Sequence, residues 1–277
     1  MRFSLCNEVL RDLPFQKQCE MAAQLGYDGL EIAPFTLCDD PRTLTDSQVG
    51  AVRRALADHG LACTGLHWLL VTPAGLSVST DDSAVLARTR ELMTRLCALA
   101  AELEARVLVH GSPAQRRLPA DPALADAARD RAIASFEIAA RAAQKAGVIY
   151  CLEPLARTET NFVNTVREAA DIVSGIGSEH LRTMIDCSAA GNTEDRPVAD
   201  LVLEWMPTGL IAHVQVNDPN RRGPGQGDMR FAPILQALVQ TGYAGDVAVE
   251  PFDYVPDGPG CAARAIGYLK GLVEAGA

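Results

Sequence analysis

The second half of the chain contains four short apolar runs: VIYCLE (148–153), LRTMID (181–186), LIAHVQ (210–215) and DVAVE (246–250). Each run ends on a side chain that can offer an oxygen atom to a metal ion. Helical sequence patterns separate each run from the next. Strands that are buried on both faces read as continuous apolar runs, and helices normally join parallel strands. We therefore expect these runs to be neighbouring strands of one parallel sheet.

The same alternation extends back to the first residues. Four more strand-like runs come earlier: FSLC (3–6), GLEI (29–32), LACTGLH (61–67) and RVLVH (106–110). Helical patterns follow the eight runs at about 15–25, 45–59, 82–105, 124–146, 165–174, 198–205, 231–240 and 261–274. Eight consecutive βα units predict a closed (β/α)8 TIM barrel. The length of 277 residues suits a single barrel domain over 1–277, since such barrels have about 250 residues.

The strand ends of such a barrel meet at one rim, which would bring Glu153, Asp186, Gln215 and Glu250 together. A single acid at a strand end is often a helix cap or a surface charge. Several converging carboxylates repel one another unless a cation joins them. Four such residues in consecutive units therefore indicate a metal site, with His213 as the alternative ligand on the third of these strands. The oxygen-rich set favours one divalent cation, Mn²⁺ before Mg²⁺ or Co²⁺.

The composition restricts the partners and the location. The net charge is −10 and the pI is about 5.0, which disfavours nucleic acid and anionic membranes as partners. The eight cysteines form no CxxC pair, and this usage suits a reducing compartment. We expect no signal peptide and no membrane span, because the N-terminus turns polar early and no apolar run approaches about 18 residues. The expected location is the cytoplasm.

Several pieces of the sequence carry a family likeness: CLEPLARTETNFVNT (151–165), HVQVNDPNRRGPGQGD (213–228), MID (184–186) and VEPF (249–252). Through them the chain resembles the xylose isomerase-like sugar isomerases and epimerases, in particular the D-tagatose/D-psicose 3-epimerase group. The likeness extends over essentially the whole chain.

The resemblance implies a β/α barrel that holds one divalent cation and acts on a small sugar. It implies that Glu153, Asp186 and Glu250 are metal ligands, and that Glu153 and Glu250 also form the acid/base pair. It places Glu159 and Arg221 on substrate hydroxyls. In the implied reaction, a base removes a proton next to a carbonyl and the cation stabilises the enediolate. The proton then returns from the opposite face, which gives epimerisation.

Other outcomes of the same chemistry stay open. Return of the proton to the adjacent carbon gives aldose–ketose isomerisation, as in hydroxypyruvate-isomerase-like enzymes. Loss of a β-hydroxyl makes the protein a keto-inositol dehydratase, which is a lyase. A non-catalytic sugar-binding protein would be expected to lack one of the two glutamates. Relatives of this kind are often dimers or tetramers, so we expect a homo-oligomer.

Two departures from the epimerase pattern prevent a prediction of the sugar. The epimerases carry H-x-H where this chain has His213, Val214 and Gln215, although hydroxypyruvate-isomerase-like relatives share H-x-Q. With Gln215 as the ligand, His213 becomes a candidate substrate contact. The epimerases also place a substrate-binding histidine three residues after the aspartate, where this chain has Ala189.

Two further histidines end predicted strands and are candidate substrate contacts. His67 is followed by Trp68, which could form an apolar wall, and His110 ends the fourth strand. Both also fit ordinary structural roles at a rim. Asn7 and Glu8 follow the first strand and could line the same mouth, but we expect Glu8 to be a surface charge. Glu31, near the end of the second strand, is a similar case.

Overall fold

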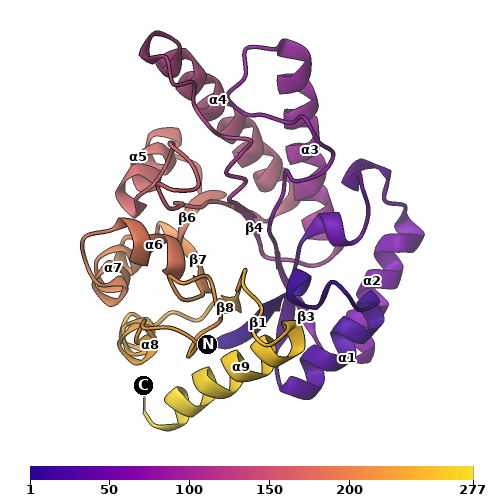
Figure 1. Cartoon of the computed structure of the whole chain (residues 1–277). Helices are drawn as coiled ribbons and strands as arrows, with labels where there is room; N and C mark the ends of the chain where they lie inside the picture. Colours follow the sequence, from indigo (N-terminus) through magenta and orange to yellow (C-terminus); the bar gives the residue numbers. More distant parts are fainter. Residues whose placement is uncertain (277) are drawn as a thin grey trace.

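The computed structural model describes residues 1–276 and consists of a closed parallel barrel surrounded by helices (Figure 1). The strands are β1 (Arg2–Cys6), β2 (Gly29–Ile32), β3 (Ala62–Leu66), β4 (Val107–His110), β5 (Ile149–Leu152), β6 (Leu181–Asp186), β7 (Ile211–Val216) and β8 (Asp246–Val249). Their spatial order follows the sequence, and β1 pairs with β8 to close the barrel. The predicted (β/α)8 TIM barrel is confirmed.

Helices connect successive strands and cover the outside of the barrel. The α-helices are α1 (Phe15–Leu25), α2 (Asp46–Asp58), α3 (Ser83–Glu102), α4 (Pro122–Ala146), α5 (Val166–Ile176), α6 (Cys187–Thr193), α7 (Val198–Trp205), α8 (Phe231–Gln240) and α9 (Gly258–Glu274). Four 3-10 helices are η1 (Asn7–Leu10), η2 (Pro34–Thr36), η3 (Pro41–Thr43) and η4 (Met206–Thr208). Local signals explain many boundaries: Thr45 forms a capping box for α2, and Gly147 adopts a left-handed conformation after α4.

Within residues 1–276, the short helix α6 is the one α-helix that the periodicity did not predict. Its seven residues, CSAAGNT, are mostly small or polar, so they show no apolar stripe. Asp186 starts the helix by accepting a hydrogen bond from the backbone N–H of Ala189. The predicted boundaries of the other elements differ from the observed ones by a few residues, because strand and helix ends carry little periodic signal.

Alternation along the strands sorts side chains into two layers. Val107, Val109, Cys151 and Met184 form a small apolar cluster inside the barrel. The intervening side chains, including Leu108 and Tyr150, face the helices and join the main hydrophobic core. The direction of each polar side chain at the rim follows from this alternation. Within residues 1–276, no helix has both the length and the hydropathy needed to cross a bilayer.

Candidate active site

Three carboxylates converge at the carboxyl end of the barrel. Glu153 directly follows β5, Asp186 ends β6 and Glu250 directly follows β8. One oxygen of each carboxylate lies within 4.8 Å of one oxygen of both others. All three residues are buried, so neither water nor distance relieves their mutual repulsion. Gly111 makes room for this arrangement, because a Cβ at that position would collide with Oε2 of Glu153.

Burial and mutual repulsion favour the protonated forms of these acids. Burial raises the pKa of Asp186 to about 7, even though the N–H of Ala189 opposes the shift. Burial and the charge of Asp186 raise the pKa of Glu153 well above its ordinary value. Glu250 shifts in the same direction through burial and the charges of Glu153 and Asp186. The three acids are therefore ionised together at neutral pH only when a positive charge lies among them.

The donor atoms fit a divalent cation. Oδ2 of Asp186 and Oε2 of Glu250 are buried and have no hydrogen-bond partner. Gln215 stands beside Asp186 in the register of β6 and β7, and its Oε1 is also buried without a partner. Its amide nitrogen donates to Glu31, which leaves the amide oxygen as the free atom. Unpaired buried oxygens from adjacent strands are the ligands that hard divalent cations use.

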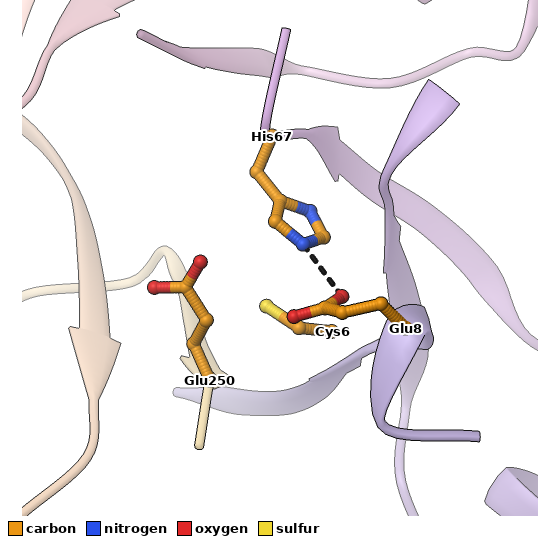
Figure 2. A group of neighbouring side chains, drawn as sticks. All are labelled: Cys6, Glu8, His67 and Glu250. Atoms are coloured by element: carbon orange, nitrogen blue, oxygen red, sulfur yellow. Dashed lines mark hydrogen bonds and ion pairs between the residues drawn. The ribbon is translucent and has the colours of Figure 1, made fainter. Parts of the chain in front are cut away.

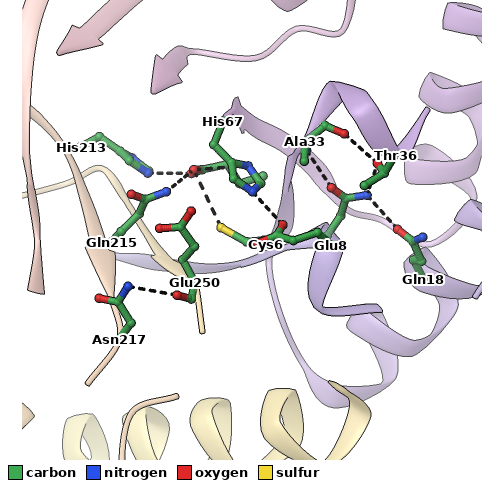
Figure 3. A network of polar contacts seen from close by, with 12 residues as sticks. Cys6, Glu8, Gln18, Ala33, Thr36, His67, His213, Gln215, Asn217 and Glu250 are labelled. Carbon is green, nitrogen blue, oxygen red and sulfur yellow. Dashed lines mark hydrogen bonds and ion pairs between the residues drawn. The ribbon is translucent and has the colours of Figure 1, made fainter. Parts of the chain in front are cut away.

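His213 has a different position from the one predicted. It lies two residues deeper on β7, with its Nε2 2.6 Å from Oε2 of Glu31 (Figure 3). Neither cavity at the barrel mouth is lined by His213. The structure therefore contradicts the predicted substrate contact and favours Gln215 over His213 as the cation ligand on β7. The physical reason is depth, because Nε2 of His213 meets the buried Glu31 carboxylate instead of the cavities.

Two adjoining cavities open beside the carboxylates and share Glu153, Glu159 and Phe252. The first also includes His67 and Trp68, and the second includes Asp186, Ala189 and Arg221.

The Trp68 and Phe252 rings meet edge to face, with centroids 6.1 Å apart, and form an apolar wall. The Arg221 guanidinium lies over the Phe252 ring at 5.0 Å. Glu159, Arg221 and His67 thus line the two cavities, and their contact with a substrate stays a prediction.

Glu8 and Glu31 contradict the expectation of surface charges, because both are buried beneath the mouth. Nε2 of His67 forms a 2.7 Å hydrogen bond with Oε2 of Glu8, and Nδ1 of His67 faces Oε1 of Glu31 at 3.7 Å. Burial raises the pKa of Glu31, but His213 and His67 outweigh it and lower the pKa overall. A charge in the middle of the apolar run GLEI was the available sequence signal for Glu31.

The family comparison agrees with this architecture. The family model described as "Xylose isomerase-like TIM barrel" matches residues 19–272. The chain belongs to this xylose isomerase-like family. The resemblance stated from the motifs is thereby confirmed.

Several proteins similar to this chain are named as sugar epimerases. A D-psicose 3-epimerase from Agrobacterium fabrum is 27% identical over 241 residues, which cover 86% of this chain and 79% of the relative. An L-ribulose 3-epimerase from Mesorhizobium japonicum is 28% identical over 231 residues, covering 81% and 72%. The crystal structure of a D-psicose 3-epimerase in the presence of D-fructose superimposes with a TM-score of 0.79 at 22% identity, covering 98% and 99% of the two chains. That structural likeness concerns the fold.

His110 lies outside the site of this xylose isomerase-like barrel. It shares the outward face of β4 with Leu108, and its ring packs edge to face on Phe136 of α4. Its Nδ1 lies 2.6 Å from the hydroxyl oxygen of Tyr150. Burial, followed by the charge of Arg116, lowers the pKa of His110 to about 3. The structure therefore contradicts the predicted substrate contact, since strand alternation turns this side chain toward the helices.

Arg116 is a structural residue of the site that the sequence did not single out. Its side chain is fully buried in the loop after β4. Nη1 donates to the carbonyls of Glu153 at 2.6 Å and His110 at 3.3 Å, and Nη2 donates to the carbonyl of Val163 at 3.2 Å. Burial lowers its pKa to about 10, although the charge of Glu153 opposes this shift. Arg116 therefore ties the loops after β4 and β5 together beneath Glu153.

The raised acid pKa values predict how stability depends on pH when divalent cations are removed. Asp186 titrates near 7 in the folded chain and near 3.8 when unfolded, so the folded state binds more protons between these values. Stability is then largest at low pH and falls as the pH rises toward 7. From pH 5 to 7.5 the loss should reach roughly 2–3 kcal/mol.

Thermal melting in EDTA and in MnCl2 at several pH values measures this dependence. We expect the melting temperature in EDTA to fall by several degrees across the window, and a bound cation to remove most of that fall. The Asp186→Asn variant, which cannot ionise, should show a shallower slope in EDTA. A melting temperature in EDTA that stays level or rises from pH 5 to 7.5 would contradict the proposed electrostatics.

Proposed function

We propose that the protein is a ketose 3-epimerase that uses Glu153 and Glu250 as its two acid/base groups. The observation that carries the proposal is the convergence of these buried glutamates, from β5 and β8, on one cavity, with an oxygen of Asp186 within 4.8 Å of both. Family membership and the sugar epimerases among the relatives support the same reaction. A binding protein would have no need of two acids with raised pKa values at one point of its cavity.

The two glutamates have separate roles in the proposed proton transfer. One glutamate, as a carboxylate, removes the proton from the carbon next to the ketone, and the other, as a carboxylic acid, returns a proton from the opposite face. Raised pKa values suit this exchange, because a carboxyl group that holds its proton more firmly than usual can also return one to carbon. Glu159 and Arg221 would hold substrate hydroxyls, while the Trp68 and Phe252 rings limit the access of water.

One divalent cation would be held by Glu153, Asp186, Gln215 and Glu250, and it would stabilise the negative charge that develops on the carbonyl oxygen. We propose Mn²⁺, because the donors are all oxygens and none is a thiolate or an imidazole. The same donor set makes Mg²⁺ or Co²⁺ the alternative to be compared in metal-replacement assays.

The reaction can be identified in deuterated water. Purified protein with MnCl2 would be incubated with D-psicose or D-fructose, and the products analysed by NMR and chromatography. Epimerisation gives the other ketose with deuterium at C3, whereas aldose–ketose isomerisation gives an aldose. A dehydratase acting on a keto-inositol generates a conjugated diketone with new ultraviolet absorbance. No conversion of any ketose in a panel, at several cations, would refute the proposal.

We further propose that the enzyme is a cytoplasmic homo-oligomer, a dimer or a tetramer. All eight cysteines are free, as expected in a reducing compartment. Leu203 on α7 and Val239 on α8 are exposed large apolar side chains on two helices that pack together. Light scattering after size-exclusion chromatography distinguishes the oligomer from a monomer, which would contradict this part of the proposal.

A further inference from the structure

A row of acidic and basic side chains crosses the barrel beneath the site and ends at Glu8 (Figure 3). Glu8 contacts His67, His67 faces Glu31, and Glu31 contacts His213 and Gln215. Burial lowers the pKa of His67, but Glu8 and Glu31 outweigh it and raise the pKa overall. Nε2 of His67 is thus hydrogen-bonded to one carboxylate of the protein, and Nδ1 faces a second carboxylate at 3.7 Å.

Glu8 is held in place from its own side of the barrel. It lies on η1, and the neighbouring Asn7 anchors that turn with three hydrogen bonds. The Asn7 amide donates to Gln18 at 2.9 Å and to Thr36 at 2.8 Å, and its oxygen accepts from the N–H of Ala33 at 2.8 Å. These bonds, to α1 and to residues 33 and 36 after β2, fix the turn that carries Glu8.

One oxygen of the Glu8 carboxylate has no partner in the protein. Oε2 of Glu8 accepts from His67, but Oε1 is buried and unpaired, and the residue is only 4% exposed. A buried acceptor without a donor costs about 1–3 kcal/mol. Donor atoms of Glu8, His67, Cys6 and Glu250 all lie within 4.8 Å of one another (Figure 2). Glu8, which carries the unpaired oxygen, thus lies next to one of the proposed acid/base groups.

The spacing suits a hydroxyl group. Two O–H···O contacts of about 2.7 Å span up to about 5.4 Å, so a hydroxyl bound at Glu250 is also within reach of Glu8. The occupant must donate a hydrogen bond to Glu8. A phosphate or carboxylate group would instead be repelled by two buried acids.

We infer that Glu8 is a further substrate-binding residue, whose unpaired oxygen accepts a hydrogen bond from a hydroxyl of a neutral sugar on the Glu250 side of the site. His67 is the positioning residue that holds Glu8. The inference rests on the proposed function, since it takes the ligand to be the ketose. It assigns to Glu8 the recognition of one hydroxyl near the reacting carbon.

The test combines a variant with sugars that lack one hydroxyl. Calorimetry would measure the binding of D-psicose and its 1-, 4-, 5- and 6-deoxy derivatives to Mn²⁺-loaded wild type, to Glu8→Gln and to the control Glu137→Gln. Glu137 is an exposed residue of α4. For wild type and the control, one deoxy sugar should bind about 10- to 100-fold more weakly than D-psicose. Glu8→Gln should lose most of that difference and bind the other sugars with a correspondingly reduced affinity.

Several outcomes would overturn the inference. A Glu8→Gln variant that keeps the full discrimination shows that Glu8 does not contact the hydroxyl. If Glu8→Gln weakens the binding of all five sugars equally, including the deoxy sugar that wild type binds most weakly, Glu8 has a purely structural role. Loss of a bound cation from Glu8→Gln, measured by elemental analysis, assigns the oxygen to a metal instead. Absence of sugar binding to wild type also counts against it.

A crystal of the wild-type protein soaked with D-psicose provides a second measurement that does not depend on the variant's folding. We expect a sugar oxygen within about 3 Å of Oε1 of Glu8. A bound sugar with no oxygen near Glu8 would overturn the inference. If wild type binds the sugar at Glu8 but converts no ketose, the proposed epimerase function fails while the assignment of Glu8 stands.

Discussion

Glu153→Gln and Glu250→Gln should each lower kcat for ketose epimerisation by about 10²–10⁴-fold, the usual contribution of a positioned acid or base. Each substitution keeps the size of the side chain but removes its ability to accept and return a proton. Because both residues are also proposed cation ligands, the assays should be run at saturating MnCl2 with the metal content measured in parallel. Glu137→Gln, an exposed glutamate on α4, is the matched control and should retain wild-type activity.

Deuterium exchange at the reacting carbon distinguishes a variant that has lost one base from a variant whose whole site is disrupted. With one glutamate left, a proton can still leave and return on the same face of the sugar. Each variant should therefore incorporate deuterium into only one of the two epimers, and the two variants should select opposite epimers. Full turnover by either variant with every accepted ketose would refute the two-base mechanism.

Arg116→Met should lower the free energy of unfolding by about 3–5 kcal/mol, which makes it the largest expected effect on stability. The substitution leaves the carbonyls of His110, Glu153 and Val163 without their buried donor. It also removes a positive charge that lies near Glu153, Glu159 and Glu168. Urea unfolding measures the change.

The neighbouring residue supplies the control for this experiment. Arg117 is exposed and makes one hydrogen bond, to the carbonyl of Glu159. Arg117→Met should therefore change the stability by less than about 1 kcal/mol. Equal stability of Arg116→Met and wild type would show that the buried guanidinium is not needed to hold the loops after β4 and β5.

The sequence predicted the barrel and its acidic rim for a simple reason. In a parallel barrel, the residue at the carboxyl end of a strand must lie at the mouth, so strand-end acids such as Glu153, Asp186 and Glu250 are visible in the chain. The direction of a side chain is harder to predict in strands that are apolar on both faces. VLVH gave no sign that His110 faces α4, because Val107 and Leu108 point to opposite layers and look alike.

The sequence did not indicate the positions of Glu8, Arg116 and His213, for other reasons. Glu8 lies on a 3-10 turn and contacts His67 across 59 residues of sequence, and nothing local predicts that pairing. Arg116 donates only to backbone carbonyls, which leave no mark in the sequence. The depth of each side chain below the rim decided between His213 and Gln215 as ligands. That depth is visible only in the folded barrel, where both side chains contact Glu31 from β2.

One divalent cation should join the last four strands, and anomalous diffraction from crystals grown with MnCl2 tests this most directly. We expect one peak at the manganese edge, within about 2.6 Å of oxygens from Glu153, Asp186, Gln215 and Glu250. An empty map at this position in manganese-replete crystals, or a peak bound by other residues, would contradict it.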